Sequence, residues 1–124
     1  MNFAYGMILV AALLPYVTVA IAKAGASGYD NADPRVWAAR QTGWRARGMA
    51  AHQNHFEAFA PFAAAVIAAS VSHGSAMAID LLAAAFVLVR VGYTAAYLAN
   101  TPTLRSTLWA VGFLCVLALF GVAI

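Results

Sequence analysis

The chain has 124 residues, of which 65% are hydrophobic and only 9% are charged, with a formal net charge of +3. Soluble domains carry roughly 25% charged residues, so this chain has too few charges to cover a water-facing surface, and disordered chains are excluded for the same reason. With a mean hydropathy of +0.82, we expect an all-α integral membrane protein. Its positive net charge is therefore attributed to contact with a membrane and not with nucleic acid.

Four apolar segments follow one another along the chain. Each is long enough to cross a hydrocarbon core of ~30 Å as a helix. We predict a four-transmembrane-helix bundle with spans at residues 3–23, 46–72, 76–99 and 104–124, forming a single domain over residues 1–124. The first segment is not read as a cleaved signal peptide, because it has no basic region before it and its apolar run is longer than usual.

The connections between these segments differ in length and charge. Residues 24–45 form the only long loop, and most of the Lys and Arg residues of the chain lie in it or beside it. Basic residues favour the cytoplasmic side of a membrane. We therefore expect a multi-pass protein of a bacterial inner membrane, with loop 24–45 in the cytoplasm and both termini outside it.

The second segment carries polar residues where lipid would be expected to exclude them. At 100° per residue, Arg47 and Asn54 lie within about 20° of one another on a helix, and Glu57 lies within about 60° of Asn54. Pro61 cannot donate a hydrogen bond to the carbonyl of Glu57. These residues therefore predict a polar face that enters the membrane from the cytoplasmic side.

The third and fourth segments carry a matching set. Arg90, Tyr93 and Tyr97 follow an i, i+3, i+7 spacing, and Arg105 and Ser106 begin the fourth segment. A lone cation near mid-bilayer costs ~2.5–3.5 kcal/mol, and Glu57 is the expected counter-ion of Arg90. Together these residues predict a basic, aromatic-lined pocket for a small anionic ligand. Two other readings stay open: the ion pair joins helices without any further role, or the tyrosines belong to an interfacial aromatic belt.

Two further signals are discounted. A metal site could be suspected at His52, His55 and Glu57. Glu57 lies about 160° around the helix from His55, so these side chains would not converge on one ion and no metal is expected. Cys115 lies in an apolar segment without a nearby charge, which is the environment of an inert thiol.

The polar residues resemble the signature of the membrane-associated proteins in eicosanoid and glutathione metabolism, the MAPEG family. The resemblance covers nearly the whole chain and rests on Asn54-x-x-Glu57-x-x-x-Pro61-Phe62 after Arg47 and His52, on Arg90-x-x-Tyr93-x-x-x-Tyr97, and on Arg105-Ser106. It implies a homotrimer of four-helix subunits that binds glutathione between neighbouring subunits.

The same resemblance assigns roles to residues. It implies that Asn54 and Glu57 hold the peptide part of glutathione, that Tyr93 and Tyr97 line the same site, and that Arg105 and Ser106 activate the thiol. With the two other arginines of the polar face, the candidate glutathione-binding residues are Arg47, Asn54, Glu57, Arg90, Tyr93 and Tyr97. The candidate catalytic residues are Arg105 and Ser106.

This chemistry agrees with general principles. A thiol has a pKa near ~8.5, so only a few per cent is thiolate at neutral pH, and a cation beside the sulfur in a desolvated site favours the thiolate. We therefore expect a glutathione-dependent transferase or peroxidase that acts on a small hydrophobic substrate arriving from the bilayer.

The chain departs from the family pattern at three positions. Ala50 stands where family enzymes usually carry an arginine. Gln53 and Trp109 stand where the prostaglandin synthase of the family has arginine and tyrosine. The first alternative is therefore a non-catalytic lipid-binding or scaffold member of the same fold. The second is a small proton-coupled exporter, which needs a membrane-embedded acid that cycles its proton.

Overall fold

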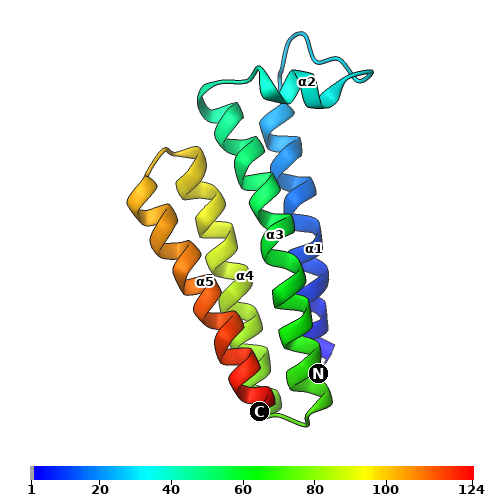
Figure 1. The fold of residues 1–124 in the computed structure, drawn as a ribbon, viewed down its shortest axis with the longest axis vertical. Helices are drawn as coiled ribbons and strands as arrows, with labels where there is room; N and C mark the ends of the chain where they lie inside the picture. Colours follow the sequence, from blue (N-terminus) through cyan, green and yellow to red (C-terminus); the bar gives the residue numbers. More distant parts are fainter. Residues whose placement is uncertain (1) are drawn as a thin grey trace.

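The computed structural model describes residues 2–124. Within these residues the chain forms five helices joined by turns and one longer loop (Figure 1). Four of the helices are long, and a short one interrupts the longer loop. They are α1 (Asn2–Lys23), α2 (Pro34–Ala39), α3 (Gly43–Val71), α4 (Ala76–Leu98) and α5 (Pro102–Ala123).

The long helices pack as two antiparallel pairs. Helix α1 lies along α3, and α4 lies along α5 (Figure 1). Both chain termini lie at the end of the bundle that carries the α3–α4 turn, whereas α2 and the α4–α5 turn lie toward the opposite end. The two pairs lie closest at the terminal end and diverge toward α2.

Two tight turns make the neighbouring helices antiparallel. Helices α3 and α4 each end with a residue in the left-handed region, His73 and Asn100, both at φ 58°. The amide of Gly74 then donates to the carbonyl of Ala69, which is the pattern of a Schellman cap and satisfies carbonyls at the helix end. At the start of α5, Pro102 supplies a φ suited to the first helical turn.

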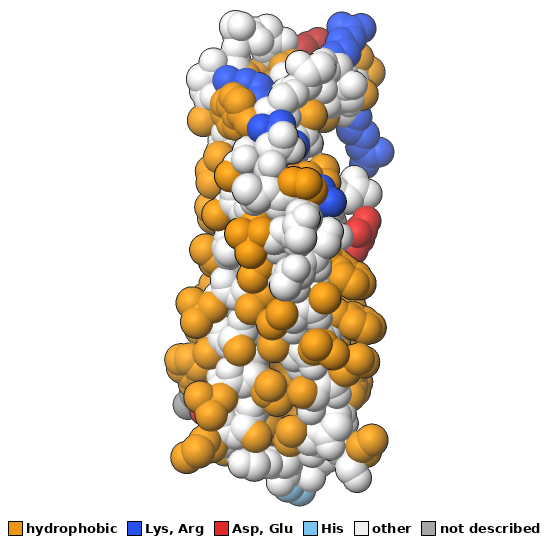
Figure 2. All heavy atoms as spheres, turned by 90° about the vertical axis from the view of Figure 1, so that its left-hand side faces the viewer, with side chains coloured by type: hydrophobic (Ala, Val, Ile, Leu, Met, Phe, Trp, Pro, Cys, Tyr) orange, Lys and Arg blue, Asp and Glu red, His pale blue; other side chains and the backbone are white. Residues whose placement is uncertain are grey.

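The apolar core occupies the half of the bundle nearer the termini. The rings of Phe62 and Phe86 stack there with centroids 3.9 Å apart and join α3 to α4. The buried apolar cluster around them draws on all four long helices and contains Ala4, Ala11, Ala65, Val66, Ala69, Ile79, Ala83, Val87, Cys115, Val116 and Leu119. Charged side chains gather toward the other end, as the face in Figure 2 shows.

One acid within the apolar half has a structural role. Asp80 lies near the start of α4, and its Oδ1 accepts a hydrogen bond of 3.1 Å from the backbone amide of Ala4. The first amides of a helix have no partner within the helix, and a carboxylate there also complements the helix dipole. Asp80 therefore caps α1 from a neighbouring helix.

The membrane prediction is confirmed in its coarser form. Three of the long helices are long and apolar enough to cross a membrane: Phe3–Lys23, Ala76–Leu98 and Pro102–Ala123. Helix α3 falls outside that group because its first half carries arginine, histidine, asparagine and glutamate. The short helix α2 was not predicted, since its six residues lie in a loop rich in turn-forming residues.

The close approach of α1 and α3 gives a testable prediction. A Cβ added at Gly48 would lie 2.9 Å from the Cβ of Ala22 and 3.4 Å from a methyl of Leu98. Gly48→Ala should therefore lower the free energy of unfolding by about 1–2 kcal/mol, because overpacking outweighs the better helix propensity of alanine. Thermal unfolding of the detergent-solubilised protein measures this.

The matched control is Gly6→Ala in α1, where an added Cβ meets nothing within 4 Å. This variant should unfold at or slightly above the wild-type temperature. A Gly48→Ala variant as stable as Gly6→Ala would contradict the close contact.

Candidate functional site

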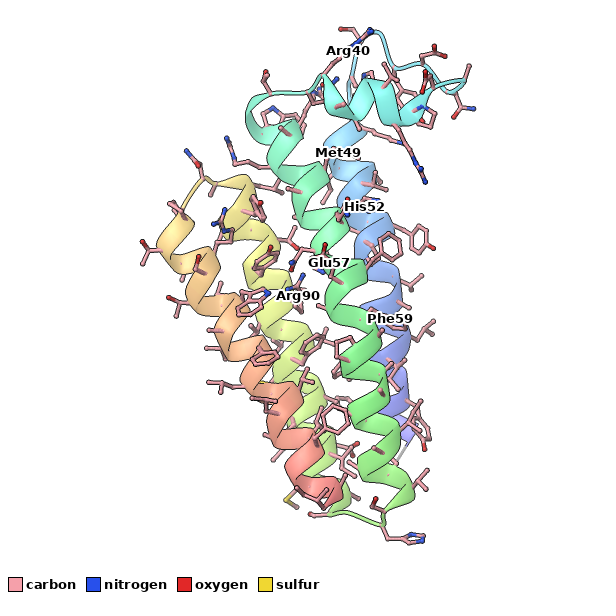
Figure 3. All side chains as sticks on the ribbon, in the orientation of Figure 1. Arg40, Met49, His52, Glu57, Phe59 and Arg90 are labelled. Atoms are coloured by element: carbon pink, nitrogen blue, oxygen red, sulfur yellow. The ribbon has the colours of Figure 1, made fainter. Side chains whose placement is uncertain are left out.

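A pocket opens where the two helix pairs diverge. It encloses about 270 Å³ and lies between α3 and α5, with α4 behind it. In Figure 3 the side chains of Glu57 and Arg90 both point into the space between α3 and the α4–α5 pair. The lining combines polar and apolar side chains, namely Asn54, Glu57, Ala58, Pro61, Phe86, Arg90, Trp109, Gly112, Phe113 and Val116.

The polar side of this pocket is built by one turn of α3. The amide Nδ2 of Asn54 donates to Oε2 of Glu57 over 3.1 Å, so the asparagine orients the carboxylate. The other amide atom, Oδ1 of Asn54, is buried and has no hydrogen-bond partner within residues 2–124. A buried acceptor without a partner costs free energy and marks a place where a donor from a ligand or a neighbour would be stabilising.

The charge behind the pocket is a buried arginine. Arg90 is 2% exposed, and its Nε and Nη2 donate to Nδ1 of His55 over 3.3 and 3.1 Å. Because a guanidinium only donates, His55 accepts at Nδ1 and carries its proton on Nε2, which lies 2.7 Å from Oγ1 of Thr94. The Thr94 hydroxyl in turn donates to the backbone carbonyl of Arg90 over 3.1 Å. The three residues therefore form a closed polar network within the bundle.

The expected ion pair between Glu57 and Arg90 is not the contact that the structure shows. His55 lies on the buried face of α3 that packs against α4, whereas Glu57 lies on an exposed face of α3. The arginine therefore reaches the imidazole first. The buried positions Ala51, His55 and Phe62 share one stripe of α3, and that spacing in the sequence would have identified His55 as an interior residue.

A column of rings and cations leads from Arg90 to the start of α5. The guanidinium of Arg90 lies 4.1 Å from the ring centroid of Tyr93, and the Tyr93 and Tyr97 rings meet edge to face at 5.6 Å. Arg105 lies 4.6 Å from the centroid of Tyr97. Tyr93 is only 4% exposed, so it is an interior residue and not part of an interfacial belt. In the described part of the chain, the Arg105 guanidinium makes no hydrogen bond.

Of the eight predicted site residues, Asn54, Glu57 and Arg90 line the pocket, and Tyr93, Tyr97 and Arg105 form the column beside it. The other two lie apart from both. Ser106 is exposed and lines a shallow hollow on α5 with Thr103 and Thr107. Arg47 donates through Nη2 to the backbone carbonyl of Leu98 over 3.1 Å, so it ties the start of α3 to the end of α4. Its Nε is buried and lacks a partner among the described residues.

Sequence reasoning missed the apolar side of the pocket. Phe86, Gly112, Phe113 and Val116 line it, and the ring planes of Trp109 and Phe113 stack with centroids 5.5 Å apart. Trp109 and Phe113 are separated by four residues, so their shared face is visible in the sequence. Nothing in the sequence tells this face from the other aromatic and apolar faces of the same helix.

The two histidines of α3 serve different neighbours. His52 Nδ1 lies 2.7 Å from the carbonyl of Pro15 in α1 and therefore donates to it, whereas His55 faces α4. Across residues 2–124 no group of three or more His, Cys, Asp or Glu side chains is placed to hold a metal ion.

The fold and the pocket together define a helical membrane protein with a polar and aromatic site midway along its bundle, where the helix pairs diverge. The sequence matches the profile of the MAPEG family over residues 3–124. No curated protein and no solved structure gave a match. Because the family match spans essentially the whole chain, the protein belongs to the MAPEG family, as the sequence motifs predict.

The closed network around Arg90 gives a testable prediction. His55→Leu should lower the free energy of unfolding by about 2–4 kcal/mol, because it leaves a buried guanidinium without its acceptor. Thr94→Val should cost less, about 1 kcal/mol, since Arg90 keeps His55. Thermal unfolding in detergent measures both.

Thr107→Val is the control for the threonine. Its hydroxyl also bonds a carbonyl four residues back, that of Thr103, but the side chain is exposed. It should leave the unfolding temperature unchanged. If His55→Leu and Thr107→Val unfold alike, the network does not stabilise the bundle.

Proposed function

We propose that the protein is a membrane glutathione transferase or peroxidase that uses the thiol of glutathione on a hydrophobic substrate. The proposal rests on the pocket at the divergence of the helix pairs, which places an oriented carboxylate and an unpaired buried acceptor beside an apolar lining. Family membership supports the same class of chemistry.

The polar side of the pocket fits the peptide part of glutathione. Oδ1 of Asn54 is free to accept a hydrogen bond from a peptide N–H, which would satisfy the buried acceptor. Glu57 presents a carboxylate that suits the ammonium group of the γ-glutamyl residue. The buried charge of Arg90 lines the same pocket and makes it attractive to an anion.

Arg105 is the residue that we assign to the thiol. Its guanidinium stacks on Tyr97 and keeps its N–H groups free of acceptors in the described chain, and Trp109, one turn further along the same face of α5, lines the pocket. A free cation at this position would stabilise a thiolate. The thiolate then attacks an electrophilic carbon, so that an S–C bond forms while the bond from that carbon to its leaving group breaks and the leaving group departs with the electron pair. Alternatively it attacks the terminal oxygen of a hydroperoxide, so that an S–O bond forms, the O–O bond breaks, and a sulfenic acid and an alcohol result. In the latter case a second thiol completes the reduction.

The apolar side of the pocket suits a substrate that arrives from lipid. Trp109 and Phe113 are 46% and 49% exposed and stand at the side of the pocket formed by α5. Their stacked rings offer a surface for an aromatic or acyl group beside the polar side that holds the thiol.

The assembly and topology are part of the proposal. Helix α3 carries Glu57 and Gln53 on exposed positions of a membrane-embedded bundle, and a carboxylate facing lipid is costly. A homotrimer in which a neighbouring subunit covers this face removes that cost.

We propose α3 as the fourth spanning helix, with loop 24–45 in the cytoplasm of a bacterium and both termini outside. Ser106, apart from the pocket of its own chain, would then act at a subunit boundary.

Glutathione binding to the detergent-purified protein, measured by calorimetry, tests the proposal. Wild type should bind saturably, and Asn54→Ala should weaken binding at least tenfold because it removes the orienting amide and the unpaired acceptor. The control is Asn31→Ala, an exposed loop position, which should bind as wild type does. A folded wild-type protein that binds no glutathione would overturn the enzyme proposal and favour the lipid-binding alternative.

A second prediction concerns Arg105. Arg105→Gln should lower kcat/KM toward a model electrophile by about 10- to 30-fold near pH 7, because the pKa of the bound thiol rises back toward ~8.5, where only a few per cent is thiolate. The loss should shrink as pH rises through that pKa. Rates measured from pH 6 to 9 give the profile, with Arg40→Gln as a control in the loop. A uniform loss at every pH would contradict thiol activation by Arg105.

A further inference from the structure

The apolar end of the pocket is closed by the core of the bundle. Phe86 and Val116 line the pocket there, are 3% and 5% exposed, and belong to the buried apolar cluster. The Phe86 ring is held in place by its stack on Phe62, whose side chain is fully buried. A ligand that passes Glu57 and Arg90, the side chains that Figure 3 shows pointing into this space, therefore meets a wall.

The pocket has room because small residues meet at one level of the bundle. Ala58 and Pro61 of α3 and Gly112 of α5 all line it. A Cβ added at the buried Gly112 would lie 3.7 Å from Cγ1 of Val89 and 3.8 Å from the ring of Phe86. These are ordinary contact distances, so a methyl group would fit without strain and would take up space beside Phe86. The glycine therefore keeps the inner end of the pocket open.

The volume of the pocket limits the size of a substrate. The pocket encloses about 270 Å³. An apolar cavity of about 150 Å³ accommodates benzene, and sites for drug-sized ligands begin at roughly 300 Å³. The thiol-bearing side chain of glutathione would share this space with the substrate. The room that remains corresponds to about one aromatic ring.

The walls of the pocket suit a flat group. Phe86 forms the wall on α4, and the parallel rings of Trp109 and Phe113 form the wall on α5, with an angle of 8° between their planes. Aromatic rings gain from stacked or edge-to-face contacts beyond the burial of their area. A long acyl chain pointing inward would instead run into Phe86 and Val116.

We propose that Gly112 and Val116 set the size of the substrate, and that the substrates are one-ring aromatic electrophiles. This inference rests on the proposed function and names its substrate class. For an aryl chloride, the glutathione thiolate attacks the ring carbon that carries the chlorine. An S–C bond forms, the C–Cl bond breaks, and chloride leaves with the electron pair. The thiol proton has gone to solvent when the thiolate formed.

Two electrophiles that differ in width test the size limit. Chlorodinitrobenzene has one ring and chlorodinitronaphthalene has two, and both lose chloride. Each kcat/KM is divided by the rate constant of the uncatalysed reaction with glutathione, which removes the difference in intrinsic reactivity. Wild type should prefer the one-ring compound by about tenfold or more, because the second ring does not fit beside Phe86.

Two variants should move the preference in opposite ways. Gly112→Ala should lower kcat/KM for chlorodinitrobenzene about tenfold, because the methyl group occupies the inner end of the pocket. Val116→Ala should raise kcat/KM for chlorodinitronaphthalene about tenfold, because it deepens that end. A residue with a purely structural role would change the rates of both compounds by the same factor.

The matched controls lie on the same helix, away from the pocket. Gly121→Ala adds a Cβ that meets nothing within 4 Å, and Val111→Ala shortens a side chain that is 39% exposed. Both controls should leave the two kcat/KM values as they are in wild type. Equal preference of wild type for the two compounds, or a parallel change of both rates in Gly112→Ala and Val116→Ala, would overturn the size limit. The thiol site stands in that case if glutathione still binds.

A binding measurement without glutathione separates this inference from the proposed function. Dinitrobenzene has no leaving group and quenches tryptophan fluorescence, and Trp109 lines the pocket. Gly112→Ala should weaken its binding about tenfold relative to Gly121→Ala. That result in a protein that binds no glutathione would refute the proposed function and keep the one-ring pocket. Equal binding by the two variants would refute the one-ring pocket.

Discussion

A single buried guanidinium sets the arrangement of the polar half of the bundle. Arg90 lies where lipid and apolar side chains would not tolerate an unpaired cation, and His55 and Thr94 satisfy it in a closed network. Because His55 takes this role, α3 must turn its buried face toward α4. Asn54 and Glu57 are thereby left to line the pocket.

Apolar packing and polar contacts occupy different halves of the bundle. The Phe62–Phe86 stack and the small residues around it hold the four long helices together near the termini. Toward α2, polar contacts replace apolar ones: Arg47 bonds the end of α4, and Arg45 bonds the carbonyls of Ala22 and Ala24. The pocket occurs where one kind of packing gives way to the other, since the helix pairs diverge there.

The pocket has one polar side and one apolar side, which is the arrangement on which the proposed function depends. The polar residues of α3 face one side of the pocket, and the aromatic residues of α5 face the other. Arg105, held against Tyr97, stands one turn above Trp109. Helix α2 carries Arg35 on the side that faces α3. Asp30 and Asp33 line a different hollow together with Arg40, so no carboxylate lines the hollow that contains Arg35.

The sequence by itself determined the class of protein, the four long helices and the candidate polar residues. Long apolar segments, and charged residues within them, can be recognised without knowing which residues are in contact. It also identified the family, since Asn54, Glu57, Tyr93 and Arg105 keep a recognisable spacing.

Tertiary structure decided which residues meet. Glu57 is the nearest acid in the sequence pattern, yet Arg90 bonds His55, because the rotation of α3 against α4 selects the partner. Ser106 lies on an exposed face of α5, away from the pocket. The position of Arg35 beside Ala50 depends on how α2 folds back, which no local pattern encodes.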